Sequence, residues 1–135
     1  MNFSSRLTGK SVLRLIATVA LALLLTNVAV AQDQEAQGIC FSGKTAVVRG
    51  FIGGEAHDSY EFHVKGGRKV TVMITSKGNH ASFSVSKEEF GEPVSFGKES
   101  NEGRTWTGTI PETGVYFISV TAHPQARYTL RVTKE

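Results

Sequence analysis

Histidines and acidic residues are the side chains of this sequence whose chemistry could hold a metal ion. The sequence has four histidines, His57, His63, His80 and His123. A zinc site needs three or four ligands that converge on one point, and the spacing of these histidines does not bring them together. Glu55 and Asp58 could offer oxygens from one loop, but calcium takes six to eight oxygen ligands and the loop lacks regular ligand spacing. We therefore expect neither a metal site nor a cofactor.

The patterns typical of hydrolytic enzymes are missing. The chain has no G-x-S-x-G nucleophile elbow and no H-E-x-x-H zinc motif, and its single cysteine, Cys40, has no catalytic context. Glu88, Glu89 and Glu92 could cut a glycosidic bond only if one lay in an apolar pocket and faced another across the substrate. They stand instead in a polar stretch beside Lys87, which favours a solvated surface. We predict a protein without catalytic activity.

The N-terminal segment, residues 1–31, has the pattern of a cleavable secretory signal peptide. Its basic residues are Arg6, Lys10 and Arg14. An apolar run over residues 15–25 follows, and then Ala29-Val30-Ala31, the small residues that signal peptidase accepts. The run is shorter than the roughly 20 residues that cross a bilayer, which argues against a stable membrane anchor. We expect cleavage between Ala31 and Gln32, and a mature protein in the periplasm or outside the cell.

The distribution of charge excludes one class of partner. The whole sequence has 15 basic and 12 acidic residues, a net charge of +3. The excess lies in the leader, so residues 32–135 carry basic and acidic side chains in equal number, mixed along the chain. The high isoelectric point is therefore no sign of nucleic-acid binding, and we expect no nucleic-acid partner.

We expect three parts along the chain. Residues 1–31 are the signal peptide, residues 32–43 a flexible N-terminal segment, and residues 44–135 a single domain with one core. One cysteine cannot form an internal disulfide, so packing must stabilise this domain. We expect Cys40 to be buried and inert, with pairing to another chain as the alternative.

Alternating apolar and polar residues predict short β-strands throughout the domain. Residues 58–64 read D-S-Y-E-F-H-V, which places aromatic and aliphatic side chains on one face, and residues 69–75 repeat the alternation. The turn between them, residues 65–68, contains two glycines, so we predict a hairpin. Further strands are expected at residues 44–51, 81–86, 105–110, 115–121 and 126–133.

Turn signals complete the predicted fold. Gly114 ends the turn at residues 111–114 and is expected to take a left-handed conformation. Residues 87–104 form a long polar stretch, in which residues 94–96 are a possible edge strand. About seven to eight short strands and no helical period predict an all-β fold, a single antiparallel β-sandwich of the jelly-roll-like kind.

The order of motifs over residues 50–132 resembles the bacterial pre-peptidase C-terminal (PPC) type of domain. The motifs are D-S-Y-x-F-x-V-x-G-G at 58–67, V-x-V-x-I at 70–74, F-x-V at 83–85, W-x-G-x-I-P-x-T-G-x-Y-x-I-x-V at 106–120 and Y-x-L-x-V at 128–132. The sequence is also similar to the periplasmic inhibitors of g-type lysozyme, which share that sandwich. The resemblance implies an exported, non-catalytic protein that contacts a lysozyme-like cell-wall hydrolase.

The resemblance also implies where such a contact would lie. In those inhibitors an arginine-bearing loop between the last two strands is implicated in contacting the lysozyme. The matching connection here, residues 122–127, is short, and it carries the candidate contact residues His123, Gln125 and Arg127. A protruding loop there, or at residues 90–96, would favour the inhibitor.

The alternative is a PPC-like module that binds carbohydrate or cell wall through an exposed aromatic residue. Trp106 and Tyr116 are the candidates for that role, since an aromatic ring can stack on a sugar. Trp106 shares a strand face with Gly108 and Ile110, and the usual burial of tryptophan favours core or rim packing for it. An exposed aromatic platform on a sheet would favour this module.

Overall fold

The computed structural model describes residues 35–135. The predicted leader and its cleavage site between Ala31 and Gln32 lie outside the described residues. The strands are β1 (Gln37–Gly38), β2 (Thr45–Gly53), β3 (Asp58–Val64), β4 (Lys69–Ser76), β5 (Ala81–Ser86), β6 (Gly97–Ser100), β7 (Thr105–Thr109), β8 (Gly114–Ala122) and β9 (Gln125–Lys134). One turn of 3-10 helix, η1 (Lys77–Asn79), joins β4 to β5, and no α-helix occurs among the described residues.

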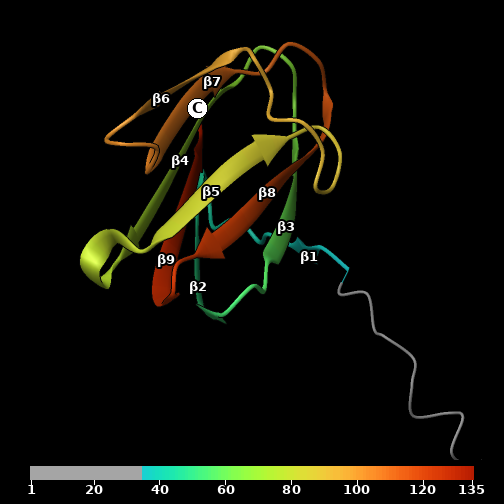
Figure 1. Ribbon diagram of the computed structural model, residues 1–135. Helices are drawn as coiled ribbons and strands as arrows, with labels where there is room; N and C mark the ends of the chain where they lie inside the picture. Colours follow the sequence, from blue (N-terminus) through green and yellow to red (C-terminus); the bar gives the residue numbers. More distant parts are fainter. Residues whose placement is uncertain (1–34) are drawn as a thin grey trace, which may run out of the picture. The chain divides into compact units, whose positions relative to one another are not determined.

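The strands form two sheets that face each other (Figure 1). Sheet A has four strands in the order β1-β3-β8-β5, and sheet B has five in the order β2-β9-β4-β7-β6. The pairings are antiparallel apart from that of β1 with β3, which is parallel. The predicted all-β sandwich is confirmed.

The core lies between the sheets and consists of the alternate residues that the sequence pattern identifies. In β9, Leu130 and Val132 are fully enclosed, whereas Arg127 and Arg131 are exposed. Burial of one leucine side chain stabilises the folded state by about 1.5–3 kcal/mol. The alternation therefore fixes which face of each strand turns inward.

The predicted hairpin of residues 58–75 is wrong, because its two strands belong to different sheets. β3 pairs with β8 in sheet A, whereas β4 pairs with β7 and β9 in sheet B. Both strands bury one face against the core, and two strands facing each other across a core show the same alternation as two paired strands. The turn at residues 65–68 is thus an arch that carries the chain from one sheet to the other.

The two glycines of this arch have different roles. Gly67 has a φ of +87°, the left-handed region that glycine adopts without steric cost. Gly66 lies against the neighbouring arch between β7 and β8, where a Cβ would come within 3.2 Å of the carbonyl oxygen of Pro111. Its N–H donates to Oγ1 of Thr113 at 2.9 Å. The two arches therefore pack directly on each other.

Gly114 is not the left-handed residue that the turn pattern predicted. Its φ lies outside the positive region, and a Cβ built on it would meet nothing within 4 Å. The residue begins β8 opposite Val64 and has extended-strand pairing. Substitution of Gly114 is therefore not expected to disrupt folding.

The edge strand of the long polar stretch lies later than predicted. Residues 94–96 are not a strand, and β6 begins at Gly97. Phe96 packs edge-on against Trp106, with 5.9 Å between ring centroids, and against Tyr116 at 6.1 Å. The ring of Phe96 thus covers the rim of the core, and β6 begins at the next residue.

Part of the segment that was expected to be flexible is held on the sandwich. β1 pairs with β3, and the N–H of Ile39 donates to the carbonyl oxygen of Glu61 at 2.9 Å. Ile39 and Phe41 pack against the core, and Cys40 between them is exposed. The prediction of a buried cysteine is wrong, since its neighbours on both sides take the inward positions.

We predict that Gly97→Ala lowers the free energy of unfolding by about 1–3 kcal/mol, the usual cost of overpacking a core. The indole of Trp106 lies across Gly97, where a Cβ would come within 2.1 Å of the ring. Gly114→Ala is the control and should change stability by less than about 0.5 kcal/mol. Urea denaturation of both variants measures the difference, and equal stabilities would contradict this account of the Trp106 contact.

Candidate functional site

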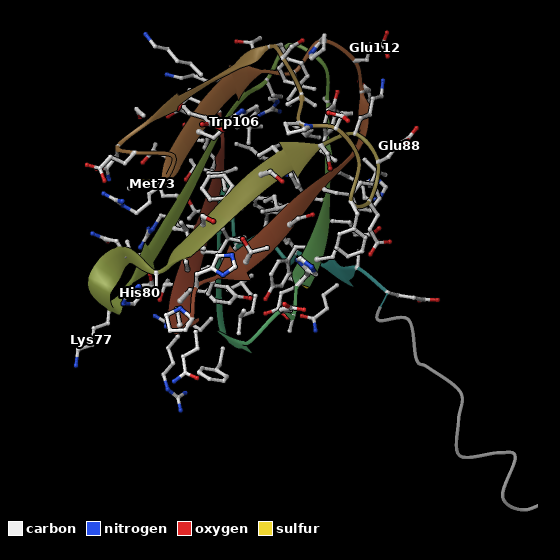
Figure 2. The ribbon with its side chains drawn as sticks, in the orientation of Figure 1. Met73, Lys77, His80, Glu88, Trp106 and Glu112 are labelled. Carbon is white, nitrogen blue, oxygen red and sulfur yellow. The ribbon has the colours of Figure 1, made fainter. Side chains whose placement is uncertain are left out.

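Three connections meet at one end of the sandwich, which we call the His123 end. The N–H of Gly54, in the β2–β3 turn, donates to the carbonyl oxygen of Pro124 at 3.2 Å. The N–H of His123 donates to the carbonyl oxygen of His80 at 3.1 Å. Figure 2 shows His80 and Lys77 at this end, away from Glu112 at the other. The turns β2–β3, β4–β5 and β8–β9 are therefore joined by backbone hydrogen bonds.

The structure brings three of the four candidate contact residues to the His123 end. His123 lies in the β8–β9 turn, and Gln125 and Arg127 point outward from the start of β9; all three are exposed. Trp106 is different, because only 4% of it is exposed. Its candidacy as a contact residue is wrong, and its side chain belongs to the core. The expectation that it packs inside is confirmed.

Tyr116 is enclosed as well, with 0% exposure, and its hydroxyl donates to the carbonyl oxygen of Glu112 at 3.1 Å. Neither Trp106 nor Tyr116 can stack on a sugar. The exposed aromatic rings in the described chain are Phe51, Phe90 and Phe96. Of these, Phe51 belongs to the His123 end, because it pairs with Arg127 across β2 and β9.

Phe51 and Arg127 form the projecting part of the site. The guanidinium carbon of Arg127 lies 5.6 Å from the centroid of the Phe51 ring, within the range of a cation–π interaction. Phe51 is 53% exposed. A large aromatic ring and a cation therefore stand together on the surface at the end of sheet B, held by the antiparallel pairing of two long strands.

A groove of about 630 Å³ opens beside this pair, along the ends of β2, β9 and β4. Its charged lining residues are Arg49, Lys77 and Arg127, and no acidic residue lines it. Phe51 and Thr129 supply apolar and hydroxyl surface between the cations. We call these residues the cationic groove; it suits a partner surface that combines carboxylates with an apolar contact.

The outward face of sheet B extends the positive charge. Arg131 lies between Val47 and Met73 in one row across the sheet, and both apolar neighbours are partly exposed. Lys69 and Lys98 also point outward from this sheet, and the outward positions of its strands hold no acidic residue. The outward face of sheet B is therefore positive, although basic and acidic residues are equal in number over residues 32–135.

A buried hydrogen-bond chain supports the cationic groove from inside. The hydroxyl of Tyr128 donates to Oδ2 of Asp58 at 2.5 Å, and the hydroxyl of Tyr60 lies 2.5 Å from that of Tyr128. Tyr128 comes from sheet B, whereas Asp58 and Tyr60 come from sheet A. The chain thus links the sheets directly beneath the groove. Gly50 makes room for it, since a Cβ there would come within 2.5 Å of the Tyr128 hydroxyl.

Burial and its partners keep Tyr128 protonated. Loss of hydration raises the pKa of Tyr128 well above the ordinary value, and the hydrogen bonds to Asp58 and Tyr60 raise it further. Burial also raises the pKa of Tyr60, against its hydrogen bond with Tyr128, which lowers it. Both phenols are therefore neutral donors at physiological pH, and Asp58 has a permanent donor in Tyr128.

Sequence reasoning missed both the hydrogen-bond chain and the groove. Asp58 and Tyr128 are 70 positions apart, so nothing in the local pattern joins them. A signal was present in Gly50, because glycine inside a strand often marks a close approach of another group. The pairing of Phe51 with Arg127 depends on the register of β2 and β9, which turn composition alone does not determine.

The acidic and histidine residues of the described part of the chain are spread over the structure. No group of three or more histidine, cysteine or acidic side chains is placed to hold a metal ion there. Lys87, which directly precedes Glu88 in the sequence, forms an exposed salt bridge with Glu112 at 2.9 Å. Within residues 35–135, no helix is long and apolar enough to cross a membrane.

The chain matches no family model, and no curated protein is similar to it in sequence. The fold, however, has clear structural neighbours. PliG of Aeromonas hydrophila, a periplasmic inhibitor of g-type lysozyme, has a TM-score of 0.63 at 24% identity over 74% of this chain and 96% of that one. The chain has a PPC-like fold.

Two further structures support this assignment of the fold. PliG of Salmonella Typhimurium, also a periplasmic inhibitor of g-type lysozyme, has a TM-score of 0.59 at 20% identity over 76% of this chain and all of that one. The pre-peptidase C-terminal domain of a Bacillus anthracis collagenase has a TM-score of 0.57 at 18% identity over 77% of this chain and all of that domain. The PPC-like fold thus resembles PliG, as the sequence motifs predicted.

We predict that alkaline pH destabilises the PPC-like sandwich through Tyr128. The unfolded chain loses its tyrosine protons above about pH 10, the ordinary tyrosine pKa, while folded Tyr128 keeps its proton. The raised folded pKa therefore adds stability that is complete below about pH 10 and is lost as the pH rises beyond it. Urea denaturation over a series of alkaline pH values measures this decline.

Tyr128→Phe is the matched variant. It should be less stable near neutral pH by about 1–3 kcal/mol, because Asp58 loses its buried donor. Its stability should also fall less steeply above about pH 10, because one buried phenol is gone. Identical slopes for the variant and the natural sequence would contradict the assigned role of Tyr128.

Proposed function

We propose that this protein is an exported, non-catalytic inhibitor of a g-type lysozyme or a related cell-wall hydrolase, which it blocks by direct protein–protein contact. The observation that carries the proposal is the exposed Phe51–Arg127 pair beside the cationic groove. The likeness of the fold to PliG supports the same interpretation, since the described sandwich matches nearly the full length of those inhibitors.

The charge of the groove is complementary to the chemistry of the proposed target. Glycoside hydrolases typically cut the glycosidic bond with carboxyl groups in an open cleft. Arg49, Lys77 and Arg127 present cations without an acidic neighbour in the groove. An arginine can bind a carboxylate with two parallel hydrogen bonds, and such pairs are strong once water is excluded.

Phe51 supplies the apolar part of the contact. Interfaces depend on a few buried anchors, among which aromatic residues and arginine are over-represented. Phe51 stacks with Arg127 and stands in the free protein with much of its ring exposed. We infer that the ring enters the hydrolase cleft and that Arg127 is brought beside a carboxylate there, while His123 and Gln125 contact the rim.

The carbohydrate-binding alternative has less support. It requires an exposed aromatic platform, and the two rings expected to form one, Trp106 and Tyr116, are both buried. Phe51 stands beside the cation Arg127, and no carboxylate that could orient a neutral sugar lines the groove. We therefore favour a protein partner over a carbohydrate.

Purified residues 32–135 are expected to inhibit lysis of bacterial cell walls by a g-type lysozyme at micromolar concentration. The double variant Phe51→Ala/Arg127→Ala should weaken inhibition by about tenfold or more, the usual effect of removing interface anchors. Because both side chains are exposed, this variant should keep the thermal stability of the natural sequence. Lysozymes of the c and i types, assayed in parallel, show whether inhibition is selective.

Lys65→Gln/Arg68→Gln is the matched control, since it removes two cations from the opposite end of the sandwich. It should inhibit as well as the natural sequence. Absence of inhibition of any hydrolase by the natural sequence would contradict the proposed function. Equal loss in both double variants would contradict the assignment to the His123 end.

Export is tested separately. Expression of the full chain in a bacterial host should yield a periplasmic or secreted protein that begins at Gln32, because Ala29-Val30-Ala31 fits signal peptidase. Intact-mass measurement of the exported fraction identifies the first residue. Ala31→Lys should block processing and retain the longer chain at the membrane, whereas an unprocessed natural chain in the cytoplasm would contradict the predicted leader.

A further inference from the structure

A second cationic site lies at the opposite end of the sandwich, which we call the Lys134 end. A cavity of about 460 Å³ opens there between the start of β2, the β3–β4 arch and the end of β9. The positions of Arg127 and Lys134 in β9 are seven residues apart, which separates the two ends by about 23 Å. Figure 1 shows the C-terminus at the same end as the β3–β4 and β7–β8 connections.

The charged residues of this cavity are all basic or histidine. They are Lys44, His63, Lys65, Arg68 and Lys134. No acidic residue lines the cavity, and none of these cations takes part in the ion pairs between described residues. Like charges brought together without counterions repel one another, and an anion in the cavity would remove that repulsion.

Lys134 is held in place before any ligand arrives. Its ammonium nitrogen lies 3.8 Å from the centroid of the Phe41 ring, and it donates to the carbonyl oxygen of His63 at 3.3 Å. The side chain is also partly buried. This ammonium group therefore gives the cavity a fixed positive centre, while Lys65 and Arg68 are exposed at its mouth.

Neutral donors and open space complete the cavity. Oγ1 of Thr113 accepts from the N–H of Gly66 at 2.9 Å, which leaves the Thr113 hydroxyl hydrogen free to donate into the cavity. Gly114 forms part of the wall, and nothing lies within 4 Å of the place where its Cβ would be. The absence of a side chain at Gly114, which no turn geometry requires, thus keeps the cavity open.

We propose that the Lys134 end binds the phosphoryl group of a small phosphate ester. Arginine matches phosphate oxygens with a planar pair of donors, and lysines add point charges. The volume lies within the usual range for small-molecule pockets and exceeds the needs of a bare phosphate ion, so the remaining space accommodates a group of about sugar size. The site is independent of the proposed inhibition, because it shares no residue with the cationic groove.

Calorimetric titration of residues 32–135 tests this proposal at about physiological ionic strength, where non-specific surface attraction is screened. Glucose 6-phosphate is the probe, with glucose and citrate as the uncharged and carboxylate comparisons. We expect saturable binding of glucose 6-phosphate, weaker binding of citrate and none of glucose. Citrate binding as tight as that of the phosphate ester would overturn the phosphoryl assignment.

Variants locate the site. Lys65→Gln/Arg68→Gln should weaken binding by about tenfold or more, because two charged donors are lost. Gly114→Val should weaken it as well by filling the cavity. Phe51→Ala/Arg127→Ala should leave it unchanged, and equal weakening by this control would overturn the location.

Two sources of the phosphoryl group are distinguished by a vesicle assay. Co-sedimentation with phosphatidylcholine vesicles that contain phosphatidic acid, compared with phosphatidylcholine alone, reports binding to a lipid headgroup. If glucose 6-phosphate releases the protein from the vesicles, and this competition is lost in Lys65→Gln/Arg68→Gln, the ester and the lipid headgroup bind in the same cavity. Binding to neither the ester nor the vesicles would overturn the proposal and leave the inhibitor proposal untouched.

Discussion

Burial of one face of each sheet against the other is the constraint on which the rest of this structure depends. Apart from the β6–β7 hairpin, each connection between successive strands in the described chain passes from one sheet to the other. Strands that are neighbours in sequence therefore face each other across the core, and their turns gather at the two ends. The same arrangement places most of the charged side chains of the described chain on outward strand faces or at the connections between strands.

The two ends differ in how they are supported. At the His123 end, Asp58, Tyr60 and Tyr128 join the sheets by hydrogen bonds, and the Phe51–Arg127 pair projects outside them. At the Lys134 end, two arches pack on each other through Gly66, and a cation rests on Phe41. The equal numbers of basic and acidic residues in residues 32–135 conceal both features, because the fold brings cations from distant segments together and no acidic residue lines either the cationic groove or the cavity at the Lys134 end.

The fold was predictable from the sequence because alternation is a local signal. Residues 58–64 and 126–133 show by themselves which face is buried, and the motifs at 58–67 and 106–120 indicate the PPC-like type. Strand partners were less predictable, since an arch and a hairpin share the same turn residues. Gly114 shows the same limit: its position in a turn motif suggested a left-handed residue, but it lies at the start of a strand.

The candidate site was predictable only in part. His123, Gln125 and Arg127 were found through the resemblance, whereas Phe51, Arg49 and Lys77 join them through the register of β2, β9 and β4. Trp106 packs in the core, as the usual burial of tryptophan predicted, but the sequence did not show that its ring fills the space left by Gly97 and Gly108, two residues on neighbouring strands. Such contacts depend on residues far apart in the sequence, and no local pattern contains them.

The two-residue strand β1 affects how easily another chain can pair with the edge of sheet A. A long unpaired sheet edge offers free N–H and C=O groups to another chain and promotes aggregation. β1 and Ile39 cover part of β3 at one edge of sheet A, and the N–H of Val94 donates to Val85 at the other edge, beside a bridge between Ser86 and Pro93. Both edges of sheet A are thus partly covered against pairing with a further chain, whereas the nine-residue strand β2, at one edge of sheet B, pairs with β9 alone among the described strands.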